Sequence, residues 1–107
     1  MKFDALELSI QLIAALRRAL EELRQRDADL ASQVRRAVSG VALQISEARK
    51  RSGKDRPHLF RLAEGSAAEV HTALRVAEAW GYLDAEALIE AYAILDRLGA
   101  MLWRLTH

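Results

Sequence analysis

Residues 4–26 read DALELSIQLIAALRRALEELRQR, and this stretch decides the fold class. Apolar side chains recur in it every three or four positions, which is the spacing of one face of an amphipathic helix. The predicted core face consists of Leu6, Ile10, Ile13, Leu16, Leu20 and Leu23. We therefore predict a first helix over residues 4–26.

The same periodicity continues to the end of the chain. It predicts three more helices, over residues 29–51, 56–80 and 85–105. Ser52-Gly53-Lys54 breaks the pattern after the second helix, and Gly81 is expected to end the third as a C-terminal cap. Asp27 or Asp29 is the expected N-cap of the second helix, and Asp55 that of the third, because a side-chain oxygen there accepts hydrogen bonds from free backbone N–H groups.

The four segments predict an all-α protein. A chain of 107 residues has the length of one domain, so the bundle is expected to occupy residues 1–107. Short connections between long helices make neighbours run antiparallel, which predicts an up-down-up-down four-helix bundle.

A second apolar row on the first helix needs a cover of its own. Its members are Leu8, Leu12, Ala15 and Ala19. They lie two positions from the predicted core face, which is about 200° around the helix. We predict that a second subunit covers this row in a homo-oligomer; the alternative is a broad monomeric core that buries both rows.

Two glycines lie at similar distances on either side of the turn between the second and third helices. Gly40 and Gly65 are therefore expected at one level of this helical hairpin, where close backbone approach explains glycine inside a helix. Ser39 and Ser66 would flank the contact. The alternative is two unrelated glycines. Close approach predicts that Gly65→Leu severely destabilises the fold, whereas unrelated glycines predict a small loss of stability.

The sequence carries no recognisable catalytic or metal-binding pattern. The chain has no cysteine, and no Glu has a His three residues later as a ferritin-like di-metal site requires. We expect Glu47 and Glu69 to pair with arginines or to hydrogen-bond Gln44; the alternative is a pair of carboxylates acting as acid and base. No catalytic residue, metal or cofactor is therefore assigned.

The N-terminus shows no secretory signal, and no apolar stretch is long enough to span a membrane. Both observations, with the absence of cysteine, predict a cytoplasmic protein without a membrane partner. The aromatic residues Trp80, Tyr82, Tyr92 and Trp103 are expected to be core or interface anchors.

Charge is uneven along the chain. Residues 49–61 carry one acid, Asp55, and a cluster of six cations: Arg49, Lys50, Arg51, Lys54, Arg56 and Arg61. Such a turn neutralises phosphates and binds nucleic acid without sequence preference. The alternative is a solvated turn whose cations favour the negative end of a helix dipole. Phe60 is the one aromatic residue within this stretch, and its position beside the core row predicts packing.

The middle of the chain carries a recognisable pattern over about 45 residues. Its elements are Ser39, Gln44-Ile45-Ser46-Glu47-Ala48, the basic turn, Phe60, Ala63, Gly65, Ser66, Glu69 and Gly81-Tyr82-Leu83. This pattern resembles the four-helix-bundle family that includes the 23S rRNA intervening-sequence proteins, also called S23 proteins, and the accessory variability determinant proteins of diversity-generating retroelements. Gln44 stands where that family usually has asparagine, and Ala48 where it has glycine.

The resemblance implies a barrel of five bundles, in which the basic turns form a ring. It implies association with nucleic acid or a ribonucleoprotein and no catalytic residue. We therefore expect a non-enzymatic, homo-oligomeric scaffold or adaptor that binds RNA or DNA phosphates. The alternative is a protein-interaction module that uses the acidic side of the last helix or the central channel of the barrel.

Overall fold

The computed structural model describes residues 4–107; residues 1–3 of the predicted domain lie outside this range. It contains α1 (Ala5–Arg26), α2 (Ala28–Arg49), α3 (Asp55–Ala79), the 3₁₀ helix η1 (Ala85–Leu88) and α4 (Ile89–Thr106), and no strand in the described range. The first three helices begin and end within two residues of the predicted positions. None of the helices in residues 4–107 combines the length and hydropathy that a membrane crossing requires.

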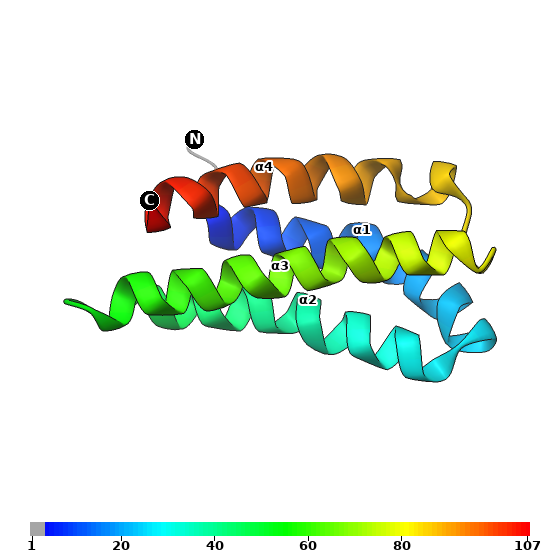
Figure 1. The fold of residues 1–107 in the computed structure, drawn as a ribbon, viewed down its shortest axis with the longest axis horizontal. Coiled ribbons are helices and arrows are strands. Elements are labelled where there is room, and N and C mark those ends of the chain that lie inside the picture. The colour runs from blue at the N-terminus through cyan, green and yellow to red at the C-terminus, as the bar shows by residue number, and fades with distance from the viewer. Residues whose placement is uncertain (1–3) are drawn as a thin grey trace.

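The helices form an elongated bundle with extents of 43 × 28 × 20 Å. Each long helix packs against two others: α1 and α3 both contact α2 and α4. Figure 1 shows the turn between α2 and α3 at the same end of the molecule as the beginning of α1 and the end of α4. Segments that are far apart in the sequence therefore meet at this end.

Aspartates begin the first two helices. Asp4 is the N-cap of α1 and Asp27 that of α2, and each carboxylate accepts a hydrogen bond from the backbone N–H three residues later, at 2.8 and 3.0 Å. The prediction that Asp55 caps α3 is wrong. Lys54 occupies that position, Asp55 is the first helical residue, and no side chain caps this helix end.

Gly81 ends α3 as predicted. Its φ of 77° lies in the left-handed region that favours glycine. The Gly81 N–H donates to the Glu78 carbonyl and the Tyr82 N–H to the Ala77 carbonyl, both at 2.9 Å. These two bonds form a Schellman motif, which satisfies carbonyls at the helix end and turns the chain toward η1.

The core face of α1 agrees with the predicted face only in part: Leu16 and Leu23 are buried as predicted, whereas Leu6, Ile13 and Leu20 are only partly buried against the core. Its buried residues are Ala5, Leu8, Ser9, Leu12, Leu16, Ala19 and Leu23. Leu8 and Leu12 are 0% exposed within the single chain, whereas Ile10 is 49% exposed. The assignment of Leu8, Leu12, Ala15 and Ala19 to an oligomer interface is therefore wrong, because the chain's own core takes up this row, with Ala15 half-buried against it.

The other helices also bury regularly spaced apolar residues. Val34, Val38, Val41 and Ile45 of α2 are buried, as are Leu95, Leu98 and Leu102 of α4. Trp80, expected to be a core or interface anchor, is 69% exposed as the C-cap of α3.

The buried face of α1 predicts that substitutions at two nearby positions differ greatly in their effect on the free energy of unfolding. Leu12→Ala empties a fully buried site, and we expect it to lower the free energy of unfolding by about 2–5 kcal/mol. Ile10→Ala removes a half-exposed side chain, and we expect a loss of about 1 kcal/mol or less. Urea unfolding followed by circular dichroism measures both, and an equal cost for the two would contradict the assignment of this face.

Candidate nucleic-acid interface

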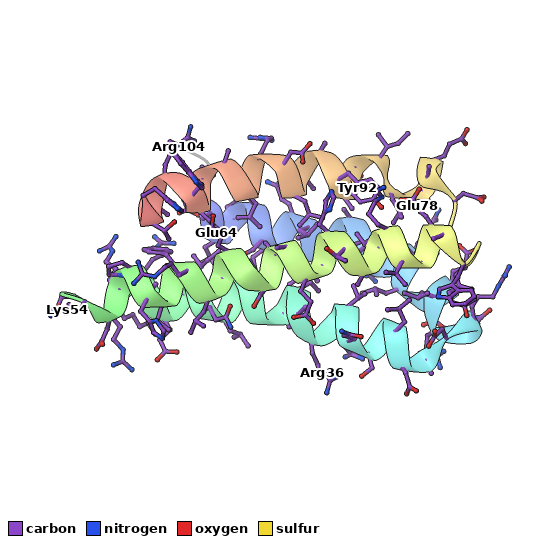
Figure 2. The ribbon with its side chains drawn as sticks, in the orientation of Figure 1. Arg36, Lys54, Glu64, Glu78, Tyr92 and Arg104 are labelled. Atoms are coloured by element: carbon purple, nitrogen blue, oxygen red, sulfur yellow. The ribbon has the colours of Figure 1, made fainter. Side chains whose placement is uncertain are left out.

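The six predicted cations run from the last turn of α2 through the connecting turn into the first two turns of α3. All six side chains are exposed. Figure 2 labels Lys54 at the tip of the molecule. Gly53 precedes it with a φ of 63°, which lets the chain reverse direction in a short turn. The turn therefore presents its charges at the extreme end of the bundle.

Two of the six cations already have carboxylate partners. Arg49 lies 3.3 Å from a carboxylate oxygen of Asp4, which joins the end of α2 to the beginning of α1. Arg51 donates to Glu47 at 2.8 Å and lies 3.9 Å from Asp55. The prediction that Glu47 pairs with an arginine is confirmed. These exposed pairs add little stability, but they reduce the local positive charge that Arg49 and Arg51 contribute.

The remaining cations keep their charge available. The side chains of Lys50, Lys54 and Arg61 make no hydrogen bond or ion pair with any residue between 4 and 107. The Arg56 guanidinium lies 5.7 Å from the centre of the Phe60 ring, in a cation–π contact that leaves its N–H groups unused. Phe60 itself is 3% exposed, so its predicted packing role is confirmed.

The sequence reasoning missed a seventh cation, Arg104. Figure 2 shows it toward the same end of the molecule as Lys54. The Thr106 hydroxyl donates to a carboxylate oxygen of Glu64 at 3.1 Å, which attaches the last turn of α4 to α3. Arg61 lies one helical turn before Glu64. The helix order predicted from sequence already placed the end of α4 near this turn, so the signal was present. We call the six cations and Arg104 the basic end.

A polar contact joins α2 and α3 next to Gly40, which is the α2 member of the predicted glycine pair. The Ser66 hydroxyl donates to the side-chain carbonyl of Gln44 at 3.0 Å. A Cβ added at Gly40 would lie 3.9 Å from the Ser66 oxygen, an ordinary van der Waals distance. Ser39, one residue earlier, is half-buried and faces α1 rather than this contact. Gln44, Ser66 and Gly40 therefore belong to the packing of α2 against α3, and Ser39 to the side of α2 that faces α1.

The predicted close approach at Gly65 is wrong. Gly65 is exposed, and a Cβ added there would meet no atom within 4 Å. Equal heights along two helices do not fix the direction in which each residue points, and Gly65 points away from α2. Glu69 is also exposed, and Gln44 bonds Ser66 instead of this carboxylate.

A second polar contact between α3 and α4 is a cluster around Tyr92. The Tyr92 hydroxyl donates to Glu78, and the His71 ring lies 5.2 Å from the Tyr92 ring. Burial raises the pKa of Tyr92, and the hydrogen bond to Glu78 raises it further, so the hydroxyl keeps its proton. Residues 4–107 contain no group of three or more His, Asp or Glu side chains placed to hold a metal ion. The cluster acts as a structural link.

A groove of about 1350 Å³ runs between α1 and α2 on another face. Ile13, Leu20 and Val38 give it apolar walls, and Ser39 lies at one side. Its cationic residues are Arg17, Arg18, Arg24 and Arg35. Arg24 is paired with Glu21 at 2.6 Å, which lowers the pKa of that carboxyl. The sequence reasoning missed this groove because it placed the wrong face of α1 in the core.

The family model for the 23S rRNA-intervening sequence protein matches residues 1–104. The chain belongs to this family. No curated protein sequence matches it. A crystal structure of an S23 ribosomal protein family member of unknown function, from Bacteroides thetaiotaomicron VPI-5482, has the same fold, with a TM-score of 0.88 at 15% identity over 96% of this chain and 98% of that chain.

In this 23S rRNA-intervening sequence family protein, the residues of the third-helix pattern divide into two groups. Phe60 and Ala63 are buried and Ser66 is half-buried, so these three support the packing of α3. Gly65 and Glu69 face solvent, and nothing in the described packing accounts for them. The basic end is a separate surface beside this pattern.

Because Gly65 is exposed, we predict that alanine at this position makes the protein more stable. Gly65→Ala adds a good helix former at an open position, and we expect the free energy of unfolding to rise by up to about 1 kcal/mol. Gly81→Ala is the contrasting variant, because its φ is positive and alanine there should lower stability by about 1 kcal/mol. Thermal and urea unfolding compare them. A strong loss of stability in Gly65→Ala would mean that another backbone covers this site.

Proposed function

We propose that this protein is a non-enzymatic scaffold or adaptor that binds RNA or DNA phosphates through its basic end. The observation that carries the proposal is the set of exposed cations Lys50, Lys54 and Arg61, whose side chains have no partner within residues 4–107, with Arg56 in the same segment and Arg104 toward the same end of the molecule. Cations that neutralise phosphates release bound counterions, which makes binding strong at low salt and weak at high salt.

The geometry favours binding without sequence preference. Lys50 and Lys54 extend from a turn that protrudes beyond the helices, so their ammonium groups reach phosphates without a fixed position against base edges. Phosphate contacts place a protein on a nucleic acid, whereas base-edge contacts read the sequence. We therefore expect affinity to depend on charge and salt rather than on sequence.

Each chain is an up-down-up-down bundle, and it associates with further copies of itself. The assembly that the family resemblance implies is a cytoplasmic homopentamer. With Leu8 and Leu12 taken up by the core, the support for association comes from large apolar side chains on the surface. Leu43 is 69% exposed and Ile89 65% exposed. Each added copy brings another basic end, which strengthens binding to one long strand through effective concentration.

A second candidate function is the binding of a protein partner, and the groove between α1 and α2 favours it. Its apolar walls and its arginines Arg17, Arg18 and Arg35 complement an amphipathic helix with acidic flanks. In this case the basic end is a solvated turn, and nucleic-acid affinity is absent.

A triple substitution tests the nucleic-acid function. Lys50→Gln, Lys54→Gln and Arg61→Gln together remove the three unpaired cations. We expect binding of a labelled single strand at about 50 mM salt to fall steeply, and the slope of log affinity against log salt to decrease by about 2. Fluorescence anisotropy at about 50 and 200 mM salt measures this.

The matched control neutralises three exposed arginines that are not part of the basic end: Arg26, Arg36 and Arg75. It changes net charge by the same amount as the triple substitution. Equal losses in the two variants would show that only overall charge matters. Unchanged binding in the first variant would reject the basic end as the site.

Association has a direct test in the mass of the protein. One chain has a mass of 12.0 kDa, and we expect sedimentation equilibrium at micromolar concentration to give a multiple of this value. A mass of one chain would reject the oligomer. Leu43→Glu is the informative variant, because a charge on an exposed apolar side chain should weaken the association without affecting the fold.

A further inference from the structure

An aromatic pair lies at the end of α4. The Trp103 and His107 rings are stacked, with centres 4.5 Å apart and planes 11° from parallel. A ring nitrogen of His107 lies 3.0 Å from the Trp103 carbonyl and 2.8 Å from the Thr106 hydroxyl, so short contacts hold the imidazole in place. Trp103 nevertheless remains 55% exposed. The packing of the chain therefore leaves more than half of the Trp103 surface open to solvent.

This pair lies beside the basic end. Arg104 follows Trp103 directly, and the Thr106–Glu64 hydrogen bond fixes the last turn of α4 against α3. Arg61 is one helical turn from Glu64, a rise of about 5 Å along α3. Arg61 on α3 and Arg104 on α4 are both exposed, and they therefore lie toward the same end of the molecule as the aromatic pair. Cations and exposed rings at one site are the combination that tracks a nucleic-acid backbone while its bases stack on a ring.

We propose that Trp103 and His107 form a stacking platform for unpaired nucleobases, so that the basic end binds single-stranded nucleic acid in preference to duplex. This inference rests on the proposed function of the basic end, and it names the class of nucleic acid that the basic end binds. Every base has a flat π face, so stacking on Trp103 requires no particular sequence. Bases in a duplex are stacked on each other and cannot reach the indole. Neither stacking nor phosphate contact reads the 2′-hydroxyl, so RNA and DNA single strands bind alike.

The second tryptophan of the chain provides a matched control. Trp80 is 69% exposed and stacks on Tyr82, with ring centres 6.3 Å apart. It ends α3, at the opposite end of the molecule from the basic end (Figure 1). The residues around it in sequence are acidic, including Glu78 and Asp84. Trp80 therefore has the exposure of a stacking platform but acidic neighbours in sequence and a position away from the basic end.

Intrinsic fluorescence separates the two tryptophans. The chain has two, so Trp80→Phe leaves Trp103 as the sole reporter and Trp103→Phe leaves Trp80. Twelve-residue oligouridylate and oligothymidylate are the probes, at about 50 mM salt, with a DNA duplex of the same length as the comparison. We expect both single strands to quench Trp103 in the first variant and to leave Trp80 unaffected in the second.

Affinity gives the independent readout. We expect Trp103→Ala to weaken single-strand binding about 5- to 150-fold, with Trp103→Phe retaining most of the affinity because it keeps a ring. Trp80→Ala should bind as the unchanged protein does. Trp103 is exposed, so its replacement should leave the helix content measured by circular dichroism unchanged.

The outcomes distinguish this inference from the function on which it rests. If Trp103→Ala binds as tightly as the unchanged protein, or if duplex and single strands bind equally, the stacking platform is rejected. Loss of binding in the triple variant of Lys50, Lys54 and Arg61 would then still support the basic end. If no probe binds at about 50 mM salt, both the platform and the proposed function are rejected.

Discussion

The burial of one apolar row from each helix is the constraint on which the rest of this structure depends. Once Leu8, Leu12 and Leu16 of α1 face inward, the arginines of that helix must face solvent and border the groove beside α2. The same packing places the end of α4 at the same end of the molecule as the turn between α2 and α3 (Figure 1). Cations that are more than 40 positions apart in the sequence thus share one end of the molecule.

Sequence periodicity predicted the helices and most of the core because α2 and α4 each carry a single apolar row. α1 carries two, and the predicted row shares only Leu16 and Leu23 with the fully buried one. The row from Leu6 to Leu23 drifts by about 100° over its length, whereas the row from Ala5 to Leu23 returns to the same angle after about five turns. A row whose members keep the same angle around the helix can stay buried along its whole length. The row that includes Leu12 meets this condition, so its angle would have identified it.

The candidate site was predictable where it is continuous in sequence and not where it depends on tertiary contacts. Lys50 and Lys54 are neighbours along the chain, so their clustering needed no structure. The pairing of Arg49 with Asp4 joins two helices, and so does the attachment of Thr106 to Glu64. The Gly65 prediction failed for a related reason, because position along a helix says nothing about which way a residue faces.

The central claim is that nucleic acid contacts one end of the bundle through both charge and stacking. Amide chemical-shift mapping with a short oligouridylate, on uniformly ¹⁵N-labelled protein, tests it directly. The account predicts shifts that concentrate in residues 49–61 and 103–107 and disappear at high salt. Shifts along the groove between α1 and α2, around Trp80, or nowhere would contradict it.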